Sequence, residues 1–92
     1  MQKKLKHTNA EVWSQANCPA CTEAKRLLEL HRIRYAEMMI DVNGYSKKDL
    51  ILKVPNARSV PQIFLDGKHI GGLPELKREL AEYDNYQKAE LE

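Results

Sequence analysis

At 92 residues, the chain has room for one hydrophobic core and not for a second. Its composition, 42% apolar and 30% charged, is that of an ordinary globular protein and excludes an intrinsically disordered one. The net charge of +2 is too balanced to indicate binding to nucleic acid or to an anionic membrane surface. We therefore predict a single domain over residues 1–92, with loosely ordered ends at 1–9 and 87–92.

The first predicted elements are a short strand and a helix. Val12 and Trp13 make residues 10–14 a short buried strand. A helix begins directly after Cys18, because Pro19 suits the first helical position, where its missing N–H costs nothing. The apolar face of this helix carries Cys21, Ala24, Leu27, Leu28 and Leu30. We expect Trp13 to pack in the core beneath it.

A second strand and a second helix are predicted in the middle of the chain. The strand covers the apolar-rich residues 35–42 and ends at Asn43-Gly44, a pair that breaks regular structure. Ser46 and Asp49 have the spacing of a capping box, so a short helix is expected to begin here.

The last third of the chain predicts a hairpin and a final helix. Two predicted strands, at 62–65 and 68–70, flank Asp66-Gly67, which is a strong signal for a tight turn between them. A final helix begins at Pro74. Its apolar face carries Leu73, Leu76, Leu80 and Tyr83.

The predicted order is therefore strand, helix, strand, helix, strand, strand, helix. A strand–helix–strand unit makes a right-handed crossover between parallel strands, whereas the closing hairpin adds an antiparallel pair. The fold class that follows is α/β, with a four-stranded mixed sheet and three helices distributed over both faces.

The two cysteines are the residues that most directly indicate chemistry. No apolar run approaches the roughly 18 residues of a membrane span, and residues 1–7 lack the apolar stretch of a secretory signal, so we expect a cytoplasmic protein. Structural disulfides do not persist in that reducing compartment. A bond between Cys18 and Cys21 would also close too small a loop to constrain the unfolded chain much. Redox chemistry or metal binding explains the pair better.

The position of the pair at a helix start suits thiol chemistry. Only a thiolate attacks sulfur, and the free N–H groups and dipole of a helix N-terminus favour negative charge. Cys18 lies at that start and Cys21 one turn further in, so the two sulfurs can meet. We predict that Cys18 is the exposed, low-pKa nucleophile and that Cys21 resolves the intermediate.

Two other interpretations of the cysteines are disfavoured. A zinc site needs four ligands, and the remaining candidates are His7, His31 and His69, at irregular spacing on separate elements. Two inert buried cysteines would not explain why the pair stands at a proline-marked helix start beside a strand–helix–strand pattern.

Three motifs occur along the chain: C-P-A-C at 18–21, S-V-P-Q-I-F at 59–64 and H-I-G-G at 69–72. They are similar to the C-P-x-C, T-V-P-Q-x-F and H-I-G-G motifs of the glutaredoxins, in that family's order and spacing, although tyrosine is usual where Ala20 stands. The resemblance covers roughly residues 10–83. It implies the thioredoxin fold, which agrees with the element order.

The resemblance implies a glutathione-dependent oxidoreductase that reduces protein disulfides and glutathione mixed disulfides through Cys18 and Cys21, with no metal. It also implies that the Val60–Pro61 bond is cis, which presents the backbone of Val60 to a bound ligand. The residues that it places around glutathione are Gln15, Pro19, Ala20, Arg58, Ser59, Val60, Pro61, Gly71, Gly72, Leu73, Pro74 and Glu75.

The same resemblance assigns parts of glutathione to parts of this site. Val60 bonds the cysteinyl part, Gly71 and Gly72 allow close approach, and the start of the last helix holds the γ-glutamyl carboxylate. Arg58 either lies near the glycyl carboxylate or is a solvated loop charge.

Two departures from the family pattern bear on glutathione binding. Many members have a lysine or arginine where this chain has Gln15, so one positive charge is missing. Pro74 has no N–H to offer a carboxylate. Glu75 either pairs with the ligand's ammonium group or simply favours the helix N-terminus.

These departures keep alternatives open. One is a glutaredoxin-like protein that is reduced by thioredoxin reductase instead of glutathione. Another is a binding module that bridges a [2Fe–2S] cluster between two protomers, although Pro19 stiffens the loop that would have to open. Ribonucleotide reductase is a common partner of the family, and nothing in the sequence identifies it here. The expected oligomeric state is a monomer.

Overall fold

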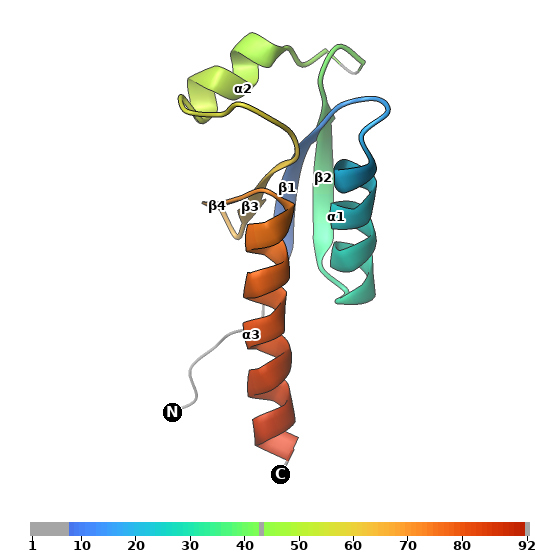
Figure 1. Ribbon diagram of the computed structural model, residues 1–92, viewed down its shortest axis with the longest axis vertical. Coiled ribbons are helices and arrows are strands. Elements are labelled where there is room, and N and C mark those ends of the chain that lie inside the picture. Colours follow the sequence, from blue (N-terminus) through green and yellow to red (C-terminus); the bar gives the residue numbers. More distant parts are fainter. Residues whose placement is uncertain (1–7, 43, 92) are drawn as a thin grey trace.

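Four strands form one mixed sheet in the order β2-β1-β3-β4 in a computed structural model, which describes residues 8–42 and 44–91 (Figure 1). The elements are β1 (Asn9–Ser14), α1 (Pro19–Leu30), β2 (Arg34–Met39), α2 (Lys47–Lys53), β3 (Gln62–Leu65), β4 (Lys68–Gly71) and α3 (Leu73–Leu91). β1 pairs in parallel with β2, whereas β3 is antiparallel to both β1 and β4. This is the predicted α/β fold. Within the described ranges, no helix is long and apolar enough to cross a membrane.

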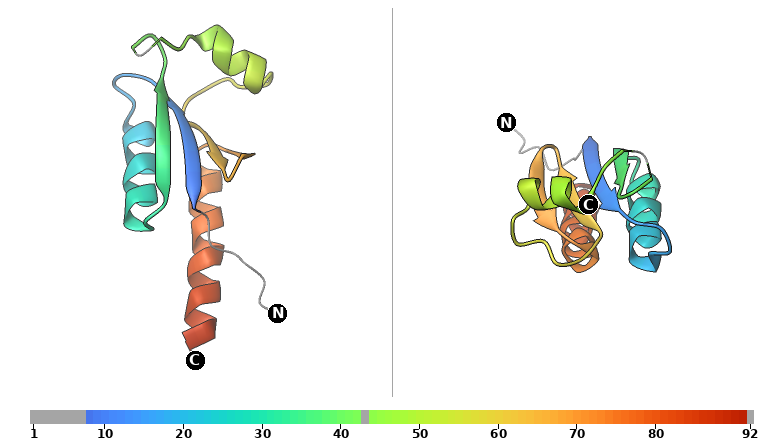
Figure 2. Two further views of the ribbon diagram at one scale, coloured as in Figure 1. Left: turned by 180° about the vertical axis from the view of Figure 1, so that it is seen from behind. Right: turned by 90° about the horizontal axis from the view of Figure 1, so that it is seen from above.

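The sheet separates two hydrophobic clusters. One lies under α1 and α3 and contains Val12, Ala24, Leu28, Ile33, Ile63, Leu65, Leu76 and Leu80. The other lies under α2 and contains Trp13, Met38, Ile40, Leu50, Val54 and Phe64. Figure 2 shows α1 and α3 along one face of the sheet, with α2 set apart from them. Both faces are therefore covered, as predicted.

Trp13 lies on the opposite face of the sheet from the one expected. It packs in the cluster under α2, and its ring meets that of Tyr45 edge-on, with centroids 5.4 Å apart. Successive side chains of a strand point to opposite faces, so Val12 faces α1 while Trp13 faces away from it. The prediction that Trp13 packs beneath the active-site helix is wrong.

Helix α1 follows the sequence signals except at its last residue. Cys18 is its N-cap and Pro19 its first residue, and Cys21, Ala24 and Leu28 are buried. Leu30 is 67% exposed, contrary to its predicted place on the apolar face. Because each helical residue turns the chain by about 100°, Leu30 lies on the other side of the helix from Leu28.

Two local sets of hydrogen bonds determine where β2 ends and where α2 begins. Ser46 and Asp49 form the predicted capping box, in which each side chain accepts from the other's backbone N–H. The strand before it is shorter than predicted: β2 ends at Met39, because the backbone N–H of Asp41 turns to donate to the carbonyl of Tyr45 at 2.7 Å.

The predicted hairpin is confirmed, and it also holds the beginning of the chain. Asp66 and Gly67 both have positive φ, 50° and 85°, as a tight turn between twisted strands requires. The Asp66 carboxylate accepts the backbone N–H groups of Thr8 and Asn9 at 3.2 and 3.1 Å. Thr8 and Asn9 are thus attached, in contrast to the loose end expected, while residues 1–7 lie outside the described residues.

Helix α3 begins one residue before the expected Pro74, at Leu73, and runs to Leu91. Leu76 and Leu80 are buried as predicted, and the Tyr83 side chain lies outside the described residues. The second half of α3 extends past the end of the sheet and of α1 (Figure 1). The backbone of 87–91 is helical, although a loosely ordered end was expected there.

Candidate active site

The two cysteines form a disulfide at the start of α1. Their Cα atoms are 5.2 Å apart. Cys18 has an extended backbone as the N-cap, and the turn before it contains Asn17 with a φ of 57°. Asn adopts this left-handed conformation more readily than most residues, which allows the chain to turn sharply from β1 into α1.

The helix start directs positive charge toward one of the two sulfurs. The backbone N–H of Cys21 donates to Cys18 Sγ at 3.1 Å, and α1 aligns its dipole behind that bond. Cys21 is 2% exposed, whereas Cys18 is partly exposed. A substrate sulfur can therefore reach Cys18 and not Cys21, and the same N–H stabilises a thiolate at Cys18 once the disulfide is reduced.

The loop before β3 passes directly beside the disulfide. The Val60–Pro61 bond is cis, as the resemblance implies, and the Val60 carbonyl oxygen lies 3.9 Å from Cys18 Sγ. The Gln62 side chain holds this loop in place, because its amide donates to the Ser59 carbonyl at 2.9 Å. Among the described residues, nothing accepts from the Val60 N–H. This backbone is free to pair with a bound peptide.

An open groove of about 530 Å³ runs from this loop to the start of α3. It is lined by Ala20, Ser59, Val60, Pro61, Gln62, Ile70, Gly71, Gly72, Leu73, Pro74 and Glu75. The groove thus brings together most of the residues that the resemblance placed around glutathione.

Within that groove, Glu75 caps its own helix. Its Oε1 accepts the Gly72 N–H at 2.8 Å. The hydrogen bonds from the backbone of Gly72 and of Glu75 itself hold the pKa of this carboxyl below its ordinary value. Gly71 has a φ of 121°, and a β-carbon there would lie 2.8 Å from Glu75 Cγ. Glu75 thus lies at the helix N-terminus with its Oε1 on the Gly72 N–H, and that donor is not open to a ligand.

A second hollow, of about 230 Å³, lies between the disulfide and α2. It is lined by Gln15, Ile40, Lys47, Leu50, Ile51, Ala57, Arg58, Ser59 and Val60. Among the side chains that the structure describes, those of residues 8–42 and 44–82, Lys47 and Arg58 have no ion-pair partner, so two positive charges border this hollow. Lys47 was not among the predicted site residues, although its place just after the helix cap was a signal that the N-terminus of α2 exposes this side chain.

A third hollow surrounds the disulfide itself and is bordered by Gln15, Pro19 and Lys25. Lys25 Nζ lies 2.9 Å from Glu37 Oε2, and the buried Ser14 hydroxyl donates to the same oxygen at 2.6 Å. Burial works to raise the pKa of Glu37, but the hydrogen bonds from Ser14 and Lys25 outweigh it and leave that pKa below its ordinary value. Ser14, Lys25 and Glu37 thus form a charged cluster, and Lys25 borders the hollow around the cysteines. This cluster was not predicted from the sequence.

Every residue that the resemblance placed at the site borders at least one of these hollows. The described part of the chain contains no group of three or more metal-binding side chains. A thioredoxin-type fold with a Cys-x-x-Cys pair at the start of its first helix defines a thiol–disulfide oxidoreductase.

Comparison with known proteins identifies the family. The glutaredoxin family model matches residues 10–70. Glutaredoxin 3 of Escherichia coli K12 is 38% identical over 68 residues, which cover 74% of this chain and 81% of that protein. Glutaredoxin 1 of Rickettsia conorii is 39% identical over 75 residues, covering 78% of this chain and 71% of that protein. The chain belongs to the glutaredoxin family.

Solved structures agree with this assignment. Glutaredoxin 1 from Francisella tularensis superposes with a TM-score of 0.70 at 28% identity, over 84% of this chain and 96% of that one. A buckwheat glutaredoxin solved in complex with glutathione superposes with a TM-score of 0.69 at 26% identity, over 79% of this chain and 68% of that one.

Proposed function

We propose that this chain is a glutathione-dependent oxidoreductase that reduces protein disulfides and glutathione mixed disulfides. The observation that carries the proposal is the Cys18 sulfur, partly exposed and held 3.1 Å from the Cys21 N–H at the start of α1. A sulfur in that position is stabilised as a thiolate and is accessible to a second sulfur. Such chemistry suits a reducing compartment such as the cytoplasm, and we propose that the protein acts there as a monomer.

The reaction proceeds in two exchanges. The Cys18 thiolate attacks one sulfur of the substrate disulfide, that S–S bond breaks, and the departing thiolate takes up a proton. Cys21 then loses its proton and attacks the Cys18 sulfur of the mixed disulfide, which releases the second substrate thiol. Two glutathione molecules reduce the resulting Cys18–Cys21 bond and leave as glutathione disulfide.

The residues around the disulfide fit most of a glutathione molecule. The free backbone N–H of Val60 suits the cysteinyl part, and Lys47 and Arg58 suit a carboxylate such as that of the glycyl part. The buckwheat relative was solved with glutathione bound, which supports the same ligand here. For the γ-glutamyl carboxylate, the Gly72 N–H is already used by Glu75, and the Leu73 N–H is the donor at the start of α3 that no described residue occupies.

The test is turnover of a small glutathione mixed disulfide, coupled through glutathione and glutathione reductase to the loss of NADPH. The wild type is expected to turn over, Cys18→Ser to be inactive, and Cys21→Ser to keep this activity while losing the reduction of protein disulfides. The proposal fails if Cys18→Ser stays active, or if the wild type shows no turnover with glutathione.

A second candidate function is reduction by thioredoxin reductase. The occupied donor of Gly72 and the uncharged Gln15 favour it, because both reduce the hold on glutathione. The same assay with thioredoxin reductase in place of the glutathione system separates the two. Turnover in that system alone would keep the roles of the cysteines and remove glutathione as the reductant.

A further inference from the structure

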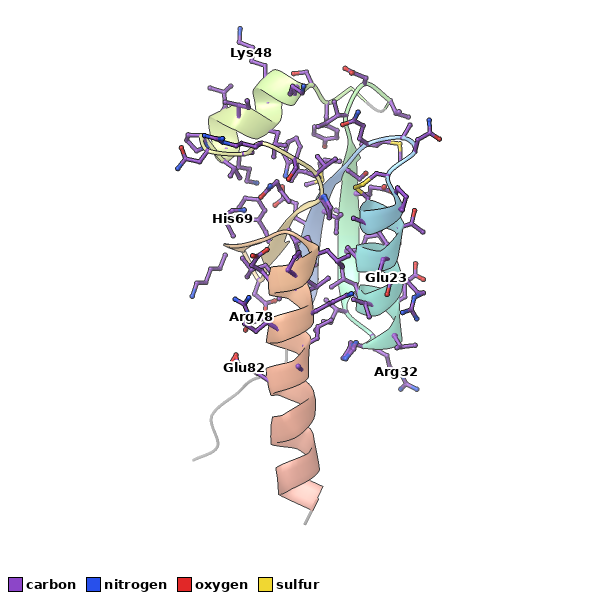
Figure 3. The ribbon with its side chains drawn as sticks, in the orientation of Figure 1. Glu23, Arg32, Lys48, His69, Arg78 and Glu82 are labelled. Atoms are coloured by element: carbon purple, nitrogen blue, oxygen red, sulfur yellow. A yellow bond between two sulfur atoms is a disulfide. The ribbon has the colours of Figure 1, made fainter. Side chains whose placement is uncertain are left out.

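Two side-chain hydrogen bonds in series connect the surface of β4 to the loop beside the disulfide. His69 lies on β4, at the edge of the sheet (Figure 3), and its Nε2 is 2.8 Å from Gln62 Oε1. The Gln62 amide nitrogen in turn lies 2.9 Å from the carbonyl oxygen of Ser59, the residue before Val60. Because Gln62 is buried, these bonds are largely shielded from water and are stronger than the same bonds on the surface.

The direction of both bonds follows from the chemistry of the groups. A carbonyl oxygen only accepts, so Gln62 must turn its NH₂ group toward Ser59 and its Oε1 toward His69. The Nε2 of His69 must then carry a hydrogen, which the imidazolium ion and one of the two neutral tautomers both provide. His69 is therefore the donor that fixes which way the Gln62 amide points.

The carbonyl of Ser59 and the N–H of Val60 belong to the same peptide group. That group is planar and the Ser59–Val60 bond is trans, so its C=O and N–H point in opposite directions. Gln62 holds the C=O, which directs the N–H away from this buried side chain, and no described residue accepts from that N–H. A hydrogen bond at the carbonyl also polarises the peptide group and makes its N–H a stronger donor.

The His69 ring is itself held by its cross-strand partner. Phe64 and His69 are paired across β3 and β4, and their ring centroids lie 5.1 Å apart. Phe64 is buried, so it gives the His69 ring a fixed surface to pack on. Packing therefore keeps the donor in reach of Gln62.

We propose that His69 and Gln62 are positioning residues, which act through the Ser59 carbonyl to orient the Val60 N–H for pairing with the backbone of a bound substrate. The inference rests on the proposed function and deepens it. A substrate with a peptide backbone, such as glutathione disulfide, depends on this alignment. A disulfide without a peptide group, such as 2-hydroxyethyl disulfide, does not.

The test compares the rates at which these two disulfides oxidise the protein. The reduced protein is mixed with an excess of each, quenched with an alkylating reagent, and assayed for the thiols that it has lost. In the first exchange the Cys18 thiolate attacks one sulfur, the S–S bond breaks, and one small thiolate leaves and takes up a proton. The second-order rate constant for glutathione disulfide, divided by that for 2-hydroxyethyl disulfide, measures what the protein gains from the peptide part.

Two variants interrupt the hydrogen bonds at different points. His69→Phe keeps a ring against Phe64 and removes the donor, so it is expected to lower the ratio at least about threefold, within the range for one hydrogen bond. Gln62→Met keeps the length of the side chain and should act alike, because it leaves the Ser59 carbonyl without this donor. A smaller change of the ratio in His69→Phe, including an equal fall of both rate constants, would overturn the inference.

A third variant separates the hydrogen bond from charge. His69 interacts electrostatically with Glu75, so its replacement also changes the charge near the groove. His69→Gln is uncharged but carries an amide donor, and it should keep the ratio within about threefold of the wild type. A ratio that stays about threefold or more below the wild type in His69→Gln would contradict the inference.

The matched control makes the same exchange at a distant histidine. His31 caps the C-terminus of α1, at the opposite end of that helix from Cys18. His31→Phe is therefore expected to leave the ratio unchanged, even where it alters stability. An equal fall of the ratio in His31→Phe would show that the effect does not come from the bond between His69 and Gln62.

A second measurement follows the same hydrogen bonds without turnover. In a proton–nitrogen correlation NMR spectrum, the Val60 amide signal is expected to move in His69→Phe and to return toward its wild-type position in His69→Gln. An unmoved signal in His69→Phe would overturn the inference. If glutathione disulfide does not oxidise the wild type, the proposed function fails, and the NMR signal still tests the orientation of Val60. If it does, and the ratio does not depend on His69, only the inference fails.

Discussion

Cys18 Sγ lies 3.9 Å from the carbonyl oxygen of Val60, although the two residues are far apart in the sequence. The contact joins the start of α1 to the loop before β3, so the reactive sulfur and the backbone that can pair with a substrate stand side by side. A substrate strand laid along Val60 has its sulfur directed at Cys18 and not at the buried Cys21.

The pKa of the reduced Cys18 thiol is expected to lie below that of a free cysteine, because the Cys21 N–H and the α1 dipole favour the thiolate. The variant Cys21→Ser keeps this N–H and leaves Cys18 as the one thiol. Its rate of alkylation by iodoacetamide, measured against pH, should reach half its plateau at a lower pH than that of glutathione. Coinciding curves would argue against thiolate stabilisation by the helix.

Lys47 and Arg58 are expected to contribute to substrate binding through charge. Replacing either by alanine should raise KM for a glutathione mixed disulfide about two- to fivefold with little change in kcat, and the effect should fade at high salt. Lys48→Ala is the matched control, because Lys48 projects from α2 away from the rest of the molecule (Figure 3). An equal effect from Lys48→Ala would mean that overall charge, and not this hollow, matters.

The cluster of Ser14, Lys25 and Glu37 should contribute pH-dependent stability. The folded pKa of Glu37 lies below its ordinary value of 4.5, so its ionised form stabilises the fold above that pH. The contribution is lost as the pH falls below 4.5 and through the folded pKa. Glu37→Gln should therefore cost about 0.5–1 kcal/mol near pH 7 and progressively less in acid, as measured by urea unfolding. A cost independent of pH would contradict this ion pair.

The Asp66 carboxylate should stabilise the beginning of β1, an interior strand of the sheet. Asp66→Ala removes the acceptor for the N–H groups of Thr8 and Asn9 and places alanine at a positive φ, so we expect a loss of about 1–3 kcal/mol in the free energy of unfolding. Asp66→Asn keeps an oxygen acceptor and tolerates the turn, so it should cost less. Equal losses in the two variants would assign the effect to the lost charge alone.

The parts of the fold that were predicted correctly depend on local chemistry. The Ser46–Asp49 capping box and the Asp66-Gly67 turn act within a few residues, so their sequence is sufficient to identify them. The cysteine pair and its helix start were found for the same reason.

The wrong or missing predictions concern contacts between residues that are not neighbours in the sequence, or side-chain directions that a sequence pattern does not determine. Val12 and Trp13 are both buried because helices cover both faces of the sheet, so the pattern could not assign Trp13 to a face. Lys47 borders the site because the fold carries α2 next to Gln15, a distant part of the chain. The hydrogen bond from the Gly72 N–H to Glu75 could not be predicted, because the sequence does not show which way the Glu75 side chain turns.

The separation of the two hydrophobic clusters by the sheet has a consequence for protein engineering. The cysteines stand on α1, on one face, while Lys47 and Ile51 reach the site from α2, on the other. A library of substitutions confined to the surface of α2 would change which substrates bind, while the cysteines on α1 stay unchanged. The protein offers a modular starting point for redox catalysts with new substrates.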